Sequence, residues 1–288
     1  METQGYDYAM ERRLRALDPE LHKRFTDAVF CLQRILSNYK LIFPDYTDHS
    51  ELHSLTVINF CNQLIGDGID ALNADEIYSL LMGCYFHDTG MGVTKKDYEE
   101  FSREMDFGDY FDTHDPDDVK ATIRDHHHKY SRFFIRKYAD LFELPSPEHL
   151  RAVAEIALGH RRTDLKDEAE YPVALKMPNG NTVCLPYLAA LIRLADEIDV
   201  ASDRNSPLLY NDKEVADILS FNMHRAVRSL EITEDAFTLV VDSSDADVFG
   251  KIKEMTVKMQ ATLDECRAAV IGRTPHSISQ KKVLIREL

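Results

Sequence analysis

The feature that most constrains this chain is a set of histidines and aspartates on the apolar faces of successive helical segments. Nine of its twelve histidines lie between residues 49 and 160. Apolar periodicity predicts helices at 19–39, 49–66, 75–89, 117–141, 147–161, 186–202 and 212–226. A buried polar group without a partner costs on the order of 1–3 kcal/mol. A bundle of these helices must therefore provide partners for the inward side chains.

A helical wheel at 100° per residue separates the side chains that point inward from those that point outward. His128, Arg162, Arg193 and Glu197 are predicted to point outward. One inward histidine is usually a hydrogen-bonded core residue, but so many on successive helices favour a shared cation. The side chains on an apolar face or at its margin are His49, His53, His87, Asp88, His126, His127, His160, Asp196 and Asp199.

The composition of the chain argues against several classes of protein. The formal charge of -16 argues against nonspecific binding of duplex nucleic acid, because neutralising phosphates requires an excess of Lys and Arg. The five cysteines are widely spaced, which is typical of reduced core thiols. The first residues contain no apolar signal core, and no segment reaches about 18 uninterrupted apolar residues. We therefore expect a cytoplasmic protein that makes no membrane contact.

The pattern changes near residue 228. Before it the chain is mainly α, interrupted by a predicted hairpin at 173–185 around Asn179-Gly180. After it we expect two short strands, a helix at 246–271 and a final strand, KKVLIREL. The sequence predicts a helical domain at 1–227 and a small α+β subdomain at 228–288.

Three motifs carry a resemblance to a known family: HSLTV around His53, YFHDTGMG around His87 and Asp88, and LIRLADEID around Asp196. Their order resembles the H…HD…D signature of the HD superfamily of metal-dependent phosphohydrolases, over roughly residues 45–205. Closest is the HD-CE branch, where YTDHSELHS, HDTGM, an R..HH..S pattern and RLADEIDVASDR recur in this order. The segments IRDHHHKYSRFFI and IALGHRR are similar to the extra histidines of two-metal HD proteins such as the HD-GYP phosphodiesterases.

The resemblance implies an HD-domain helical bundle and assigns roles to the inward residues. His53, His87, Asp88 and Asp196 would bind one divalent ion, and Asp88 would bridge to a second ion held by His160 and His127. Apolar periodicity alone slightly favours His126 over His127, so both remain candidates. These ligands do not distinguish Mn, Fe, Co, Ni, Zn or Mg. Two ions roughly 3.5–4 Å apart would activate a hydroxide that attacks phosphorus. Asp199 is expected to orient a ligand or the water, and the candidate phosphate clamps are Arg124, Arg161 and Arg204.

The chain also departs from the HD-GYP pattern. Met91 stands where those proteins carry the lysine of an x-G-K continuation, and no GYP triplet follows His160, which argues against cyclic di-GMP hydrolysis. His49 occupies the position of an additional ligand, for a third ion, in some members.

Three functions compete at this point. The leading interpretation is hydrolysis of a phosphate ester of a small molecule, a nucleotide in particular. The alternatives are a diiron oxygenase of the HD fold and a non-catalytic nucleotide-sensing module. In the last case residues 228–288 would serve dimerisation, giving a homo-oligomer, or partner docking.

Overall fold

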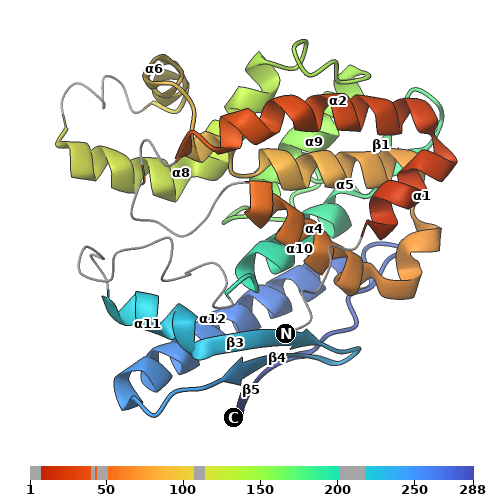
Figure 1. Ribbon diagram of the computed structural model, residues 1–288. Helices are drawn as coiled ribbons and strands as arrows, with labels where there is room; N and C mark the ends of the chain where they lie inside the picture. Colours follow the sequence, from red (N-terminus) through yellow and green to blue (C-terminus); the bar gives the residue numbers. More distant parts are fainter. Residues whose placement is uncertain (1–7, 40–42, 44–50, 107–113, 201–217) are drawn as a thin grey trace.

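The computed structural model describes residues 8–39, 43, 51–106, 114–200 and 218–288, and most of them are helical (Figure 1). The mainly α class predicted from the sequence is confirmed. The helices that build the bundle are α1 (Ala9–Leu17), α2 (Pro19–Leu36), α4 (Glu51–Ile65), α5 (Ala74–Phe86), α6 (Lys95–Glu104), α8 (Pro116–Lys137), α9 (Pro147–Gly159) and α10 (Leu185–Glu197).

Capping residues determine where the helices begin. Asp18 caps α2 by accepting hydrogen bonds from two backbone amides of its first turn, and Pro19 occupies the position that needs no donor. Asn73 and Glu76 form a capping box at the start of α5. The short helices α1 and α6 were not predicted, since each is rich in charged residues and buries only a narrow stripe.

Helix α5 is the centre of the bundle. All but the first of its thirteen residues are buried, as expected for a helix surrounded by other helices. It packs against α2, α4, α9 and α10. Its end therefore lies deep inside the bundle, where His87 and Asp88 follow it.

The predicted hairpin forms from β1 (Leu175–Lys176) and β2 (Thr182–Val183) and is fixed to the start of α5 by a buried carboxylate. Asp75 accepts hydrogen bonds from the amides of Asn179 and Asn181 at 2.9 and 2.7 Å, and its other oxygen lies 2.9 Å from Nε2 of His149. Burial acts to raise the pKa of Asp75, but these hydrogen bonds outweigh it and lower the pKa to about 2.

The last part of the chain forms a three-stranded sheet of β3 (Val227–Ile232), β4 (Ala236–Val241) and β5 (Lys282–Glu287), in the order β3-β4-β5. Strand β4 is antiparallel to β3, with Leu239 opposite Leu230, and parallel to β5, with Leu239 opposite Ile285. The predicted succession of strand, strand, helix and strand is therefore correct.

Helix α12 (Ala246–Val270) connects β4 to β5 and lies between the sheet and α10 (Figure 1). Val248 and Ile252 belong to the core under the sheet, whereas Leu263 and Cys266 belong to the core of the bundle. The domain boundary at 227 stays a prediction.

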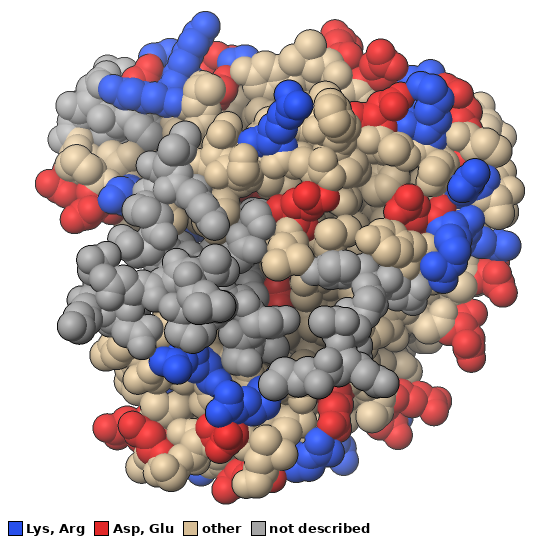
Figure 2. Space-filling view, in the orientation of Figure 1, with Lys and Arg blue, Asp and Glu red and all other residues tan. Residues whose placement is uncertain are grey.

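Helix α11 (Ile218–Ala226) precedes the sheet, and the first part of the helix predicted at 212–226 lies outside the described residues. No described helix is both long and apolar enough to cross a membrane. On the face seen in Figure 2, acidic and basic side chains are interspersed.

Candidate metal centre

Six imidazole and carboxylate side chains from five helices converge at the middle of the bundle. His53 comes from α4, His87 and Asp88 follow α5, and Asp196 lies in the last turn of α10. His127 comes from α8, and His160 follows α9. Two groups of three buried residues have ligand atoms that all lie within 4.8 Å of one another: His53, His87 and Asp88, and then Asp88, His127 and His160.

Asp88 belongs to both groups because its two oxygens face opposite ways. Its Oδ2 lies 3.4 Å from Nε2 of His53 and 3.3 Å from Nε2 of His87. Its Oδ1 lies 3.3 Å from Nε2 of His127 and 3.8 Å from Nε2 of His160. One carboxylate can thus serve two cation sites.

Asp196 completes the first group. Its Oδ1 lies 3.2 Å from Nε2 of His53 and 4.0 Å from Nε2 of His87. Two ligands about 2.1 Å from one ion, at angles of about 90–110°, lie about 3.0–3.4 Å apart. Most of the distances in both groups agree with that geometry.

The protonation of the histidine rings supports metal binding. Nδ1 of His87, His127 and His160 lies 2.6–2.8 Å from the carbonyl oxygen three residues earlier in the same helix. A carbonyl only accepts, so each Nδ1 donates a hydrogen bond, and in the neutral form of such a ring Nε2 is the atom with the lone pair. The same ring arrangement is typical of metal-binding histidines.

These lone pairs face one another across short distances. Nε2 of His53 lies 3.1 Å from Nε2 of His87, and Nε2 of His127 lies 2.8 Å from Nε2 of His160. Burial and the neighbouring His127 and His87 hold the pKa of His160 well below its usual range, so its ring is neutral. A metal ion between the two nitrogens of each pair would accept both as ligands, so these short distances fit a metal site.

Three of these helices direct their carboxyl-terminal ends at the centre. His87 is the C-cap of α5, His160 is the C-cap of α9, and Asp196 lies at the end of α10. Unpaired carbonyls at such ends give a negative potential that favours a cation.

Gly90 lies in the short 3₁₀ turn η2 (Thr89–Met91). The helix predicted at 75–89 would end just before it, but α5 already ends at Phe86. A Cβ at Gly90 would come within 2.1 Å of the carbonyl oxygen of His127. Absence of a side chain therefore allows the turn after Asp88 to pack directly on α8.

Ser131 fixes that contact and was not singled out as functional. Its hydroxyl donates to the carbonyl oxygen of His87 at 2.5 Å and accepts from the amide of Gly90 at 2.8 Å. The final serine of the R..HH..S pattern thus joins the turn after α5 to the helix that carries His127.

The predicted outward orientations of two side chains, one on α8 and one on α10, are wrong. His128 is buried, and burial together with the charges of His127 and Arg161 lowers its pKa to about 3. Arg193 is also buried. Its guanidinium donates hydrogen bonds to the carbonyl oxygens of Gly159 and Thr163, which offset the cost of burying the charge. A helical wheel counts apolar neighbours and does not register a polar group that finds its partners inside.

The other predicted site residues lie as follows. The structure brings His127 into the second group, whereas His126 does not join it. Arg124 and Arg161 line a cavity of about 270 Å³ that opens onto Asp88, His127 and Asp196. His49 and Arg204 lie outside the described residues.

A comparison with models of protein families identifies the family of the chain. The HD-CE family model matches residues 43–270, which is most of the chain.

The chain belongs to the HD-CE family. Comparisons with curated proteins and with solved structures find no match. Membership in HD-CE, an HD-superfamily family, suggests a metal-dependent hydrolase, and the buried His and Asp groups of this HD-CE protein can hold metal ions.

Asp199 orients the ring of His53 for metal binding. Its Oδ2 accepts a hydrogen bond from Nδ1 of His53 at 2.7 Å, which leaves Nε2 directed at Asp88 and Asp196. We expect Asp199→Ala to weaken metal binding by about 10–100-fold, as found for other residues that orient metal ligands. Asp199→Asn should retain more affinity, since its amide oxygen can still accept this bond.

Competition with a chelating dye measures this affinity, and circular dichroism of the same samples reports folding. Unchanged metal affinity in a folded Asp199→Ala protein would show that Asp199 does not orient the ligand.

Proposed function

We propose that this protein is a metal-dependent phosphohydrolase that cleaves a phosphate ester of a nucleotide. The observation that carries the proposal is the pair of histidine groups whose Nε2 atoms lie around the two oxygens of Asp88. Ions bound there would polarise the phosphoryl oxygens and lower the pKa of water.

Side chains of the protein position the ligand atoms of the two groups. Asp88 fixes the separation of the two groups, and Asp199 sets the orientation of His53. Nε2 of His127 and Nε2 of His160 face Asp88 from the opposite side. Among the described residues the cluster is almost fully buried except toward the cavity, so we expect a substrate to approach it through this cavity.

Basic side chains around that opening favour an anionic substrate. Arg124, Arg161 and Lys258 all line the cavity of about 270 Å³. Hydrolysis of a phosphate ester requires positioning and charge stabilisation more than a dedicated organic base. The guanidinium groups of Arg124 and Arg161 suit phosphate oxygens because they can donate two parallel hydrogen bonds.

A phosphate-release screen tests the proposal directly. Protein stripped with a chelator and reloaded separately with Mn, Co, Ni, Zn, Fe or Mg is assayed against a panel of nucleotides. We expect release of inorganic phosphate or of a nucleoside monophosphate with at least one metal. Consumption of dioxygen by the iron form, without phosphate release by any form, would instead support the oxygenase interpretation.

Arg161 offers a test of substrate binding separate from the metal. We expect Arg161→Ala to raise KM by about tenfold, the equivalent of one lost charge-assisted contact, while metal content stays unchanged. Steady-state kinetics and elemental analysis give the two quantities. A KM equal to that of the wild type would remove Arg161 from the substrate site.

A further inference from the structure

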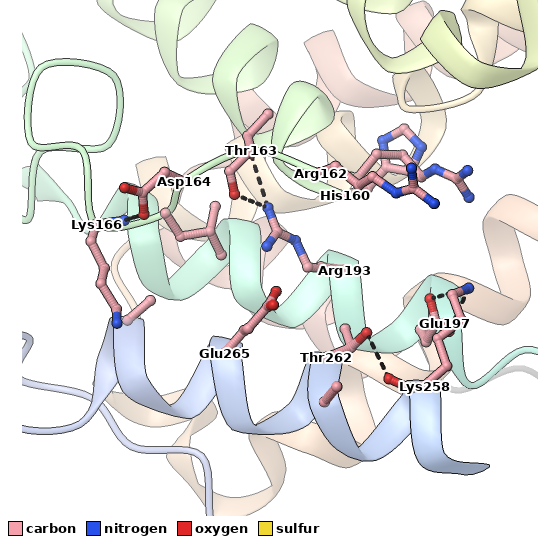
Figure 3. Close-up of a pocket in the computed structure, with 14 residues that line it drawn as sticks. His160, Arg162, Thr163, Asp164, Lys166, Arg193, Glu197, Lys258, Thr262 and Glu265 are labelled. Atoms are coloured by element: carbon pink, nitrogen blue, oxygen red, sulfur yellow. Dashed lines mark hydrogen bonds and ion pairs between the residues drawn. The ribbon is translucent and has the colours of Figure 1, made fainter. Parts of the chain in front are cut away.

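A second, larger cavity of about 680 Å³ adjoins the metal centre. It lies between the segment 160–166 after α9, one face of α10 and one face of α12 (Figure 3). Arg161, Glu197 and Lys258 line both this cavity and the one that opens onto Asp88, so the two cavities are adjacent. The smaller cavity falls just below the range of about 300–1,000 Å³ typical of ligand sites. A nucleotide bound at the metal centre would therefore extend into the larger one.

The lining of the larger cavity is basic, although the whole chain has a formal charge of -16. Three acidic side chains contribute to it: Asp164, Glu197 and Glu265. Five basic side chains outnumber them: Arg161, Arg162, Lys166, Arg193 and Lys258. A concave basic surface on an acidic protein concentrates positive potential where it can attract an anion.

Two of these cations already have partners. Arg193 donates to Gly159 and Thr163, and Lys258 pairs with Glu197 at 2.9 Å. Among the described residues, by contrast, the charged groups of Arg161, Arg162 and Lys166 form no ion pair and no side-chain hydrogen bond. Three cations thus remain available to a ligand.

The segment that carries them is held in place at several points. Nε of Arg193 donates to the carbonyl oxygen of Gly159 at 2.7 Å, and its Nη2 donates to the carbonyl oxygen of Thr163 at 2.9 Å. Arg273 donates to the carbonyl oxygen of Lys166 at 3.0 Å. Such fixation reduces the ordering that a ligand must impose on binding.

The available cations lie at both ends of the cavity. Figure 3 shows Arg162 beside His160 at one end and Lys166 at the other, with Arg193 and Glu265 between them. A ligand whose first phosphate reaches the metal centre past His160 would place further anionic groups next to Arg162 and Lys166.

We infer that the larger cavity binds a second phosphate of the substrate, so that the substrate is a nucleotide carrying at least two phosphate groups. This inference rests on the proposed function. Either a nucleoside polyphosphate or a linear dinucleotide supplies the required chemistry.

Binding to three adenine nucleotides tests the inference without turnover. AMP, ATP and the linear dinucleotide pApA are titrated calorimetrically into the full-length protein loaded with a divalent metal that supports no phosphate release in the screen. We expect ATP or pApA to bind at least about tenfold more tightly than AMP, because each charge-assisted contact is worth about that factor. Comparing the affinities for pApA and ATP shows whether the protein prefers two phosphates separated by a nucleoside or phosphates joined directly to one another.

Substitutions in the larger cavity test whether the difference in affinity between AMP and the other two nucleotides arises there. We expect Arg162→Gln combined with Lys166→Gln to abolish the preference over AMP and leave AMP binding unchanged. Lys282→Gln is the matched control, since Lys282 is an exposed lysine in β5 that does not line either cavity. Equal affinities for the three nucleotides, or a preference that survives the double substitution, would overturn the inference.

The two proposals fail in different ways. If no metal form hydrolyses any nucleotide but the preference depends on Arg162 and Lys166, the hydrolase proposal fails and the cavity remains an anion site. If phosphate is released with the same KM for AMP, ATP and pApA in wild type and double variant, the hydrolase proposal stands and the second phosphate site does not.

Discussion

Replacing Asp88 by alanine is expected to reduce metal-dependent phosphate release by at least about 10³-fold, since each tenfold in rate corresponds to about 1.4 kcal/mol and a bound metal supplies several kcal/mol. The reason is geometric. Asp88 is the member common to both ligand groups, with one oxygen for each. Its loss removes a ligand from both sites at once, so bound metal should fall together with activity.

Elemental analysis of the purified variant and a phosphate-release assay measure the two effects. Asp235→Ala serves as the control, because its carboxylate is largely exposed in the turn between β3 and β4 and belongs to neither ligand group. Circular dichroism should show that both variants keep the helical content of the wild type. Full metal occupancy in folded Asp88→Ala protein would contradict the assignment of Asp88 as a shared ligand.

Gly90→Ala is expected to have the largest effect on stability of any change near the centre, about 3 kcal/mol of unfolding free energy. Its new Cβ would meet the carbonyl oxygen of His127 at 2.1 Å and the amide of Ser131 at 2.7 Å. Both are backbone atoms of a packed helix, so the clash cannot be relieved by rotating a side chain, and overpacking of this kind typically costs about 1–3 kcal/mol or more. Helix α8 must move away, which would also separate His127 from Asp88.

Chemical denaturation of Gly90→Ala and Gly68→Ala provides the comparison. At Gly68 the nearest atom to an added Cβ is Cγ2 of Ile65 at 3.8 Å, an ordinary contact. We therefore expect Gly68→Ala to change the unfolding free energy by less than about 1 kcal/mol. Equal midpoints for the two variants would show that the turn after Asp88 has room to adjust.

Periodicity predicts the longer helices of the bundle, because their core-facing side chains are apolar and regularly spaced. In the helix predicted at 75–89, His87 shares one face with the apolar residues Ile77, Leu80 and Cys84, and the structure shows all four buried. Boundaries were less accurate, since the predicted helix at 75–89 ran past the point where α5 ends at Phe86. Ends depend on capping and on contacts with distant segments, which a local pattern does not contain.

The choice between His126 and His127 shows the limit of a helical wheel. Both lie near the inward face of α8, and the wheel slightly favoured His126. Nδ1 of His127 donates to the carbonyl oxygen of Arg124, which points its Nε2 at Asp88. Ring orientation of this kind arises from one hydrogen bond and has no signature in apolar periodicity.

The larger cavity was beyond sequence analysis for a related reason. Its walls come from the segment 160–166, α10 and α12, which the predicted domain boundary assigned to separate units. Only the packing of α12 between the sheet and α10 brings Lys258 and Glu265 opposite Arg162.

The convergence of the carboxyl-terminal ends of α5, α9 and α10 on the carboxylates of Asp88 and Asp196 has a consequence for the order of events. Without cations this spot combines helix-end carbonyls with acidic oxygens, so it repels a phosphate. Under the proposed function the reaction then follows a compulsory sequence in which the ions enter first and reverse the sign of the local field. Only the loaded protein would present its substrate with an attractive surface at both ends.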